Sequence, residues 1–194
     1  MEALVDLSME LHQVKDIDIL MENILTWARN FAAADAGSIY LKDGNRLKFS
    51  YTQNETLQRR LHPGEKLIYS TFEIPVDRTS IAGYVASSGE QLHIADTENM
   101  DPALHFRFNR AFDEASGYWT QSLLTTPLKT SRGDIVGILQ IINCRTAEGR
   151  KIPFPPDTER FMAVFAGMAA IALERAKMTR EMILRTIRMA EMRD

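Results

Sequence analysis

Side chains suited to binding a small molecule are concentrated between residues 106 and 120. The polar groups are Asn109, Asp113, Glu114, Ser116 and Thr120, and they are interleaved with the rings of Phe106, Phe108, Phe112, Tyr118 and Trp119. Aromatic rings can cover the faces of a planar ligand while hydroxyl groups and a carboxylate bind its polar edge. The segment therefore predicts the lid of a pocket for a planar, polar molecule.

The sequence does not indicate a catalytic or metal site. The four histidines stand on unlike predicted elements, and none lies in a nucleophile motif: His12, His62, His93 and His105. Histidine, cysteine and carboxylate residues do not cluster at the spacing of metal ligands, and the sequence has no glycine-rich phosphate loop. Asp113-Glu114 is best interpreted as part of a solvated turn. We predict no catalytic residue, no metal ion and no certain cofactor.

A short helix with clear ends precedes the lid. Ser80 has the side chain of an N-cap, and Gly89 is placed for a left-handed stop. The first amides of a helix have no partner inside it, and the helix dipole favours an anion in front of them. The amides of Ile81 and Ala82 are therefore candidate anion ligands. An ordinary surface helix with an ordinary cap is the alternative.

Alternating apolar residues predict the strands of a sheet. The segments are 36–42, 47–51, 72–76, 92–95, 123–128 and 135–142. Asp43-Gly44-Asn45 predicts a hairpin turn, with Leu47, Phe49 and Tyr51 alternating on the returning strand. Residues 52–69 are polar, and we expect a loop there. The pattern predicts an α+β fold: a central antiparallel sheet of about six strands, helices on one face and a ligand cleft on the other.

Two amphipathic helices are expected before the sheet. Apolar residues in the first helix recur three and four positions apart, at Leu4, Leu7, Leu11 and Val14. The second helix is capped by Asp16 or Asp18. Its predicted buried residues are Leu20, Ile24, Trp27 and Phe31.

A long helix is predicted from residue 158 to about residue 193. Its residues Phe161, Val164, Phe165 and Met168 should pack against the sheet. Two apolar rows continue beyond Leu173, formed by Ala176, Ile183, Ile187 and Ala190 and by Met178, Met182 and Met189. An apolar seam that leaves a domain is typical of a dimerisation or signalling helix, so we expect a homodimer through the terminal helices.

Composition narrows the classes of partner. The formal net charge of -3 over 194 residues argues against a general nucleic-acid or membrane-surface binder. Cys144 is the one cysteine, so an intrachain disulfide is excluded and a reducing cytoplasm is expected. Apolar runs do not reach the roughly 20 residues that span a bilayer, and we expect neither a signal peptide nor membrane insertion.

Three blocks of the sequence resemble a GAF domain. They read TSIAGYVASSGEQLHIAD, DPALHFRFNRAFDEASGYWTQSLLTTPL and GDIVGILQIIN, and the resemblance runs from about residue 20 to residue 173. The middle block is most similar to GAF domains of mammalian cyclic-nucleotide phosphodiesterases and cyanobacterial adenylyl cyclases. The resemblance implies a cyclic nucleotide as candidate ligand, with its phosphate at the amides of Ile81 and Ala82. It further implies a site formed by Ser80, Ile94, Asp96, Phe108, Asn109, Asp113, Ser116 and Thr120.

One signature of the family is altered. The family pattern is Asn-Lys, then Phe, then Asp-Glu, whereas this chain has Asn143-Cys144, Phe154 and Thr158-Glu159. The Lys–Asp salt bridge of the family cannot form here. In the family that pair is structural and does not contact the ligand.

The last residues, MILRTIRMAEMRD, resemble the beginning of an HD-GYP phosphodiesterase domain of bacterial signalling proteins. The implied division is an N-terminal helix at 1–18, a sensor domain at 19–173 and a signalling helix at 174–194 that leads to an output domain. Three functions stay open. They are a ligand-binding regulatory sensor, a dimerisation scaffold without a ligand, and an enzyme of the free methionine sulfoxide reductase type, which needs several cysteines.

Overall fold

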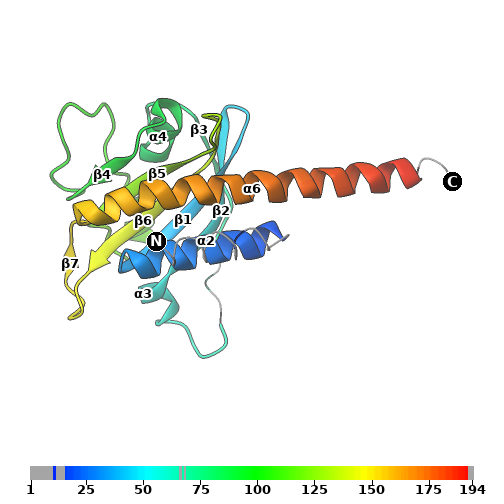
Figure 1. Ribbon diagram of the computed structural model, residues 1–194. Coiled ribbons are helices and arrows are strands. Elements are labelled where there is room, and N and C mark those ends of the chain that lie inside the picture. The colour runs from blue at the N-terminus through cyan, green and yellow to red at the C-terminus, as the bar shows by residue number, and fades with distance from the viewer. Residues whose placement is uncertain (1–10, 12–15, 66, 68, 192–194) are drawn as a thin grey trace.

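The computed structural model describes residues 11, 16–65, 67 and 69–191. Their strands form one antiparallel sheet in the order β3-β2-β1-β6-β5-β4, with the two-residue β7 added beside β6 (Figure 1). The bounds are β1 Ala34–Asp43, β2 Arg46–Asn54, β3 Glu73–Pro75, β4 Leu92–Ile94, β5 Leu123–Lys129, β6 Ile135–Arg145 and β7 Lys151–Ile152. The predicted α+β fold with a sheet of about six strands is confirmed.

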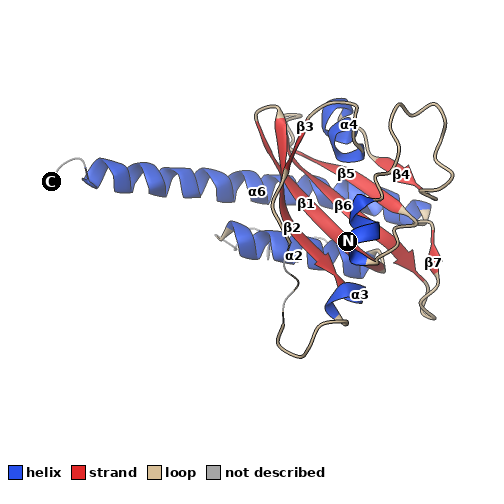
Figure 2. Ribbon diagram, turned by 180° about the vertical axis from the view of Figure 1, so that it is seen from behind, coloured by secondary structure: helices blue, strands red, loops and turns tan. Residues whose placement is uncertain are grey.

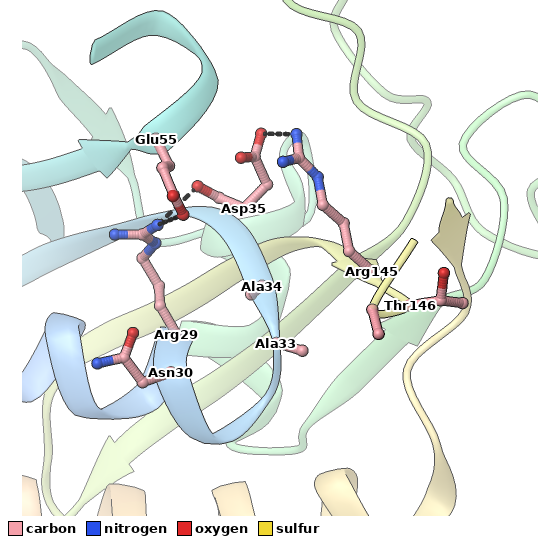
Figure 3. A pocket seen from close by; sticks show the side chains of 9 residues that line it. Arg29, Asn30, Ala33, Ala34, Asp35, Glu55, Arg145 and Thr146 are labelled. Atoms are coloured by element: carbon pink, nitrogen blue, oxygen red, sulfur yellow. Dashed lines mark hydrogen bonds and ion pairs between the residues drawn. The ribbon is translucent and has the colours of Figure 1, made fainter. Parts of the chain in front are cut away.

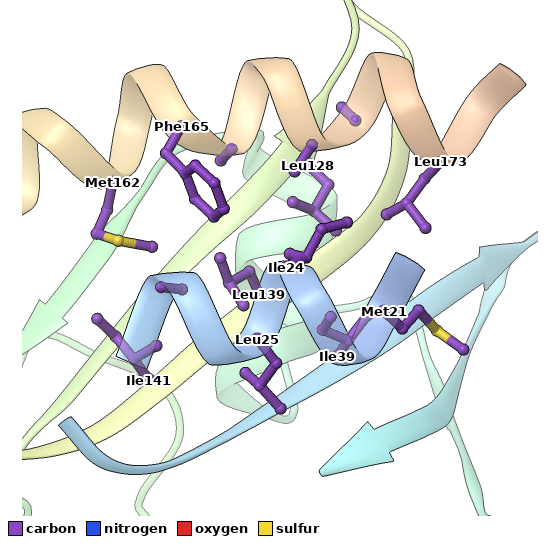
Figure 4. Packing of buried hydrophobic residues seen from close by; sticks show 14 of the residues in the cluster. Met21, Ile24, Leu25, Ile39, Leu128, Leu139, Ile141, Met162, Phe165 and Leu173 are labelled. Carbon is purple, nitrogen blue, oxygen red and sulfur yellow. The ribbon is translucent and has the colours of Figure 1, made fainter. Parts of the chain in front are cut away.

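Two long helices cover one face of the sheet (Figure 1). They are α2, Ile17–Phe31, and α6, Pro156–Glu191. Their inward side chains meet those of the central strands in the main core, where Ile24, Leu25, Leu139, Ile141 and Phe165 are fully buried (Figure 4). Asp16 caps α2 by accepting hydrogen bonds from the amides of Asp18 and Ile19, as the sequence suggested.

The opposite face carries shorter helices and the lid segment (Figure 2). These helices are α4, Ile81–Ser88, and α5, Ala111–Ser116. Val85 and Ala86 of α4 pack on Tyr40, Phe49 and Ile138 of the strands. The predicted site residues that belong to α4 and α5 therefore lie on this face.

The buried stripe of α2 differs from the prediction. Leu20 and Ile24 are buried, but Trp27 is 44% exposed and Phe31 is 52% exposed. The covered face is centred on the neighbouring residues Ile17, Met21, Leu25 and Ala28. Val164 of α6, expected against the sheet, is 57% exposed. These errors share a cause, because periodicity finds apolar positions on a helix but not the element that covers each of them.

The expectation of a loop over residues 52–69 was wrong in its first part. Strand β2 continues to Asn54, and the helix α3, Glu55–Gln58, follows at once. Asn54 caps this helix by accepting a hydrogen bond from the amide of Leu57 at 2.9 Å. A helix of four residues is too short to give a periodic pattern, so its cap was the one signal available.

A β-bulge also alters the expected alternation of β2. Ile39 pairs with Tyr51 and Tyr40 pairs with Phe49, which leaves Ser50 as the extra residue. Tyr51 consequently packs against the core under α2 and α6, while Leu47 and Phe49 pack on the face of α4. The three residues do not share a face.

The ends of the chain are only partly described. The predicted helix over residues 1–14 lies outside the described residues except for Leu11, which is helical and 1% exposed. Across the described residues, every helix is too short or too polar to cross a membrane.

Candidate functional site

The N-terminus of α4 has the geometry that the sequence predicted. Ser80 accepts a hydrogen bond from the amide of Gly83 at 3.1 Å, and Gly89 ends the helix with φ of 71°. Ile81 and Ala82 are 8% and 4% exposed. A Cβ atom on Gly83 would lie 2.7 Å from the carbonyl oxygen of Pro75, so the chain leaving β3 passes tightly against this first turn.

Asp113 and Thr120 are brought together at the centre of the lid. Asp113 is 2% exposed and accepts hydrogen bonds from the amide and hydroxyl of Thr120 at 2.8 and 2.9 Å. It also forms an ion pair with Arg110 at 2.8 Å. The polar atoms of both predicted residues are thus engaged within the lid itself.

Arg110 is a central residue of the lid that the sequence interpretation missed. Its guanidinium donates to the carbonyl of Thr120 at 2.8 Å and to the hydroxyl of Thr97 at 2.7 Å. It lies 4.1 Å from the ring centroid of Trp119 and 4.9 Å from that of Phe108. Cation–π contacts of this kind stabilise the charge while the rings shield it. The sequence signal was weak, because Arg110 is one of two arginines among the rings and carboxylates of this segment, the other being Arg107.

Asn143 ties the lid to the end of β6. Its side-chain oxygen accepts from the amides of Gln121 and Ser122, and its side-chain nitrogen donates to the hydroxyl of Tyr118 and the carbonyl of Trp119. Asn143 is fully buried and has φ of 55°. The family pattern had marked this residue, but not this role.

The other predicted residues are spread over the edge of the lid. Asn109 is exposed and accepts from the amide of Ala111 at 2.9 Å, and Ser116 donates to the carbonyl of Phe112 at 2.7 Å. Asp96 accepts from the side chain of Asn99 and the amide of Glu98, and these hydrogen bonds lower the pKa of its carboxyl group. These polar groups do not converge on one point with Asp113.

Apolar side chains fill the space between α4 and the lid. Ile81, Ile94, Phe106 and Leu123 form a buried cluster, and Phe108 packs against it. The ring of Phe106 is 5% exposed and its centroid lies 5.3 Å from that of Tyr84. Phe106 therefore packs against the side chains of Ile81 and Tyr84 on α4.

A polar cavity of about 450 Å³ lies between the end of α2, the start of β1, α3 and the end of β6 (Figure 3). Arg29 of α2 donates to the carbonyl of Asp35 at 2.9 Å and lies 3.4 Å from the carboxylate of Glu55. Arg145 of β6 pairs with the Asp35 carboxylate at 2.7 Å. Burial lowers the pKa of Arg29. The two arginines are thus balanced by two carboxylates, and the cavity has no excess charge to select a charged ligand.

A second cavity, of about 810 Å³, adjoins the first along β2. It shares Arg29, Asn30 and Glu55 with the first cavity and extends to Tyr69. Sequence reasoning missed both cavities, because their walls come from α2, β1, α3 and β6, whose pairing is a property of the folded chain.

Groups suited to metal or redox chemistry do not assemble in the part of the chain that the structure describes. The described residues contain no group of three or more histidine, cysteine or carboxylate side chains that could hold a metal ion. Cys144 is 4% exposed, and burial raises the pKa of its thiol, which disfavours the reactive thiolate.

His93 makes a structural contact between β4 and the start of α6. Its Nδ1 atom lies 2.7 Å from the carboxylate of Glu159 in the first turn of α6, and its Nε2 atom accepts from the amide of Phe154 at 3.3 Å. Glu159 is the second residue of the family's Asp-Glu pair, in which Thr158 replaces the Asp in this chain. Glu159 pairs with His93 of β4.

Comparison with known proteins identifies the family to which this fold belongs. Residues 16–173 match the family model of the GAF domain. The fold is similar to the GAF domain of a phosphoenolpyruvate-protein phosphotransferase from Coxiella burnetii, with 17% identity over 93% of this chain and 95% of that chain and a TM-score of 0.67.

Two further solved structures carry the same fold in other settings. One is the GAF domain/HD domain protein from Geobacter sulfurreducens, with 12% identity, coverage of 87% and 98% and a TM-score of 0.59. The other is a free methionine-R-sulfoxide reductase from Neisseria meningitidis in complex with its substrate, with 16% identity, coverage of 89% and 84% and a TM-score of 0.57. At these identities the likeness shows the fold alone. Because the family model covers most of the sequence, this chain belongs to the GAF domain family.

Proposed function

We propose that this chain is a regulatory sensor module that binds a small molecule under the lid and transmits the change through α2 and α6 of a homodimer. GAF domains are in general ligand-binding regulatory domains without catalytic activity. The observation that carries the proposal is the exposed C-terminal part of α6, which extends beyond the sheet. All residues from 181 to 190 are exposed, and they include Ile183, Leu184, Ile187 and Met189. Exposed apolar area of this extent marks an interaction surface.

A cyclic nucleotide is the proposed ligand class. The first amides of α4 can accept its phosphate, and the lid supplies rings and polar groups for the base and ribose. Phe106 packs against Ile81 and Tyr84 of α4, and binding is proposed to move this ring and open the lid. An opening of this kind is what a sensor needs, because a ligand can shift an equilibrium only through different contacts in its two states.

The proposed output is a phosphodiesterase of the HD-GYP type in the cytoplasm. Its support is the sequence resemblance at the end of α6 and the Geobacter protein, which joins a GAF domain to an HD domain. The chain itself is proposed to be non-catalytic. A reductase mechanism is disfavoured because the one thiol, Cys144, is buried in the core under α2 and α6.

Thermal unfolding in the presence of cAMP, cGMP and other nucleotides tests the ligand. A ligand at one hundred times its Kd adds about 2.7 kcal/mol, which should raise the Tm by roughly 5–10 °C. Phe106→Ala should enlarge this response because it clears the space in front of α4. Phe112→Ala is the matched control, since Phe112 is 60% exposed on α5.

A scaffold without a ligand is the second candidate. The packing of Ile81, Ile94, Phe106 and Leu123 in the cleft favours it. Under this alternative neither the natural chain nor Phe106→Ala responds to any nucleotide, while the dimer persists in sedimentation.

A further inference from the structure

The larger of the two polar cavities is lined by one side of α2. Its volume is about 810 Å³, and all of its lining residues come from residues 22–69. Glu22, Arg29 and Asn30 belong to α2, and most of the other lining residues belong to β2 and α3. The ligand site predicted from the sequence uses residues from the range 80–120, so the two sites share no residue.

One end of this cavity carries a positive charge. Arg29 lies 3.4 Å from one carboxylate oxygen of Glu55, and Arg59 pairs with the other oxygen (Figure 3 shows Arg29 and Glu55 pointing toward one another). Two guanidinium groups thus share one carboxylate, and the three groups together have a charge of +1. The neighbouring pair of Arg145 and Asp35 adds no net charge. The side chain of Arg59 is 71% exposed, so it is free to turn toward a second carboxylate.

The opposite end of the cavity carries a negative charge. Glu22 is an exposed lining residue, and it stands seven positions before Arg29 on the same helix. Helix positions seven apart lie two turns apart on one side, with their Cα atoms separated by roughly 10 Å. Tyr51 lies close to this carboxylate, because burial raises the pKa of Tyr51 and the charge of Glu22 adds to the rise. The positive and negative ends are therefore roughly two helical turns apart.

Gln53 of β2 connects the two ends of the cavity. Its side-chain oxygen accepts a hydrogen bond from Arg29 at 2.8 Å. Its side-chain nitrogen donates to the hydroxyl of Thr26 at 2.8 Å and to the carbonyl of Glu22 at 3.3 Å. The distance between the charged ends is thus set by a helix and a strand, and regular elements hold a spacing more accurately than loops do.

A cavity with separated charges of opposite sign selects a molecule with the same separation. The charged residues that line it are two cations, Arg29 and Arg59, and two anions, Glu22 and Glu55. A ligand with a single charge is attracted at one end and repelled at the other, whereas a zwitterion is attracted at both ends. A chain of three residues spans at most about 10–11 Å. An unblocked tripeptide therefore has its ammonium group and its carboxylate at a matching distance.

We propose that this cavity binds a short unblocked peptide of about three residues, with its carboxylate at Arg29 and Arg59 and its ammonium group at Glu22. The rings of Tyr51 and Tyr69 also line the cavity, and aromatic faces attract ammonium groups. The inference goes beyond the proposed function and does not rest on it, because the lid supplies none of the lining residues. A nucleotide under the lid and a peptide beside α2 would bind at different places, so the peptide would be a second effector.

Calorimetric titration with triglycine tests the site in the natural chain. Acetyl-triglycine lacks the ammonium group and triglycine amide lacks the carboxylate, so each should bind with a Kd at least roughly tenfold higher than that of triglycine. Glycine has both charges but cannot reach both ends, and it should bind as weakly as the blocked peptides. The proposal is overturned if triglycine does not bind, or if the blocked peptides or glycine bind as tightly as triglycine.

A single substitution locates the bound peptide. Glu22→Gln removes the negative end at an exposed position, and we expect it to raise the Kd of triglycine at least roughly fivefold while leaving that of acetyl-triglycine unchanged. Glu90→Gln makes the same change at an exposed position beyond α4 and should alter the Kd of triglycine less than about twofold. Equal effects of the two substitutions would place the peptide elsewhere and contradict the proposal. The response to nucleotides should be the same in both variants, so this result is separate from the test of the lid.

Discussion

At the scale of single residues, Tyr40 shows how burial controls a titratable group. Its ring is 9% exposed and meets the ring of Phe49 edge-on at 5.3 Å between centroids. Burial raises the pKa of Tyr40 to about 12, because the phenolate would lose its hydration in this core. The folded chain therefore keeps Tyr40 neutral at a pH where the unfolded chain ionises.

Tyr40→Phe should make the chain less sensitive to alkali. The phenol of the unfolded chain has a pKa of about 10, so the contribution of Tyr40 is intact below pH 10 and is lost as the pH rises toward 12. At pH 11 the loss is about 1 kcal/mol. Urea unfolding at pH 8 and pH 11 should show a correspondingly smaller decrease for the variant. An equal decrease in both proteins would contradict the burial effect.

At the scale of elements, Asn143 is the joint between the lid and the sheet. It makes four hydrogen bonds to residues 118–122 from one buried side chain at the end of β6. It also has a left-handed backbone conformation, which alters the alternation of the strand: Ile141 and Cys144 both face the core under α2 and α6. The position of the lid therefore depends on a residue outside the lid.

Asn143→Ala should loosen the lid more than any exposed lid substitution. It removes four hydrogen bonds to buried groups and replaces asparagine, which tolerates a left-handed conformation, with alanine, which tolerates it less well; together these changes cost about 2–4 kcal/mol. Asn109→Ala is the control, since Asn109 is exposed and its side chain accepts a hydrogen bond from the amide of its near neighbour Ala111. Urea unfolding and the near-ultraviolet circular dichroism of the aromatic side chains, which include Trp119 of the lid, measure both variants. Equal, small changes would show that the lid is held elsewhere.

Local signals explain which elements could be predicted. Ser80 and Gly89 mark the ends of α4 because caps act on adjacent residues, and Asp43-Gly44-Asn45 marks a hairpin for the same reason. The bulge at Ser50 was not predictable, because it exists only relative to the partner strand. The exposure of Trp27 and Phe31 was not predictable either, because an apolar residue on a helix can be covered by another chain as well as by the protein's own core.

The candidate site needed distant contacts that spacing cannot reveal. Asp113 was selected as a ligand contact, but its partners Arg110 and Thr120 occupy it inside the lid. The polar cavity depends on Arg145 reaching Asp35 and Thr56 from the far end of the chain. Residue types therefore predicted a polar lid, but the hydrogen bonds within the lid could be identified only from the folded structure.

At the scale of the whole molecule, the stability of the domain should not depend on the C-terminal end of α6. Ala176 is buried at 5%, and no residue between 177 and 190 is buried. A chain ending at Lys177 should remain folded, with a free energy of unfolding within about 1 kcal/mol of the intact chain measured as a monomer. It should sediment as a monomer or a much weaker dimer. Loss of the native circular dichroism spectrum would contradict this independence.

The reach of α6 has a mechanical consequence. From Ala176 to Glu191 the helix continues for roughly 22 Å beyond the last buried contact, at about 1.5 Å per residue. A rod held at its base amplifies small rotations, so a tilt of roughly 5° at Ala176 moves the tip by about 2 Å. A rearrangement too small to separate packed side chains in the domain could thus still displace the C-terminal end of α6.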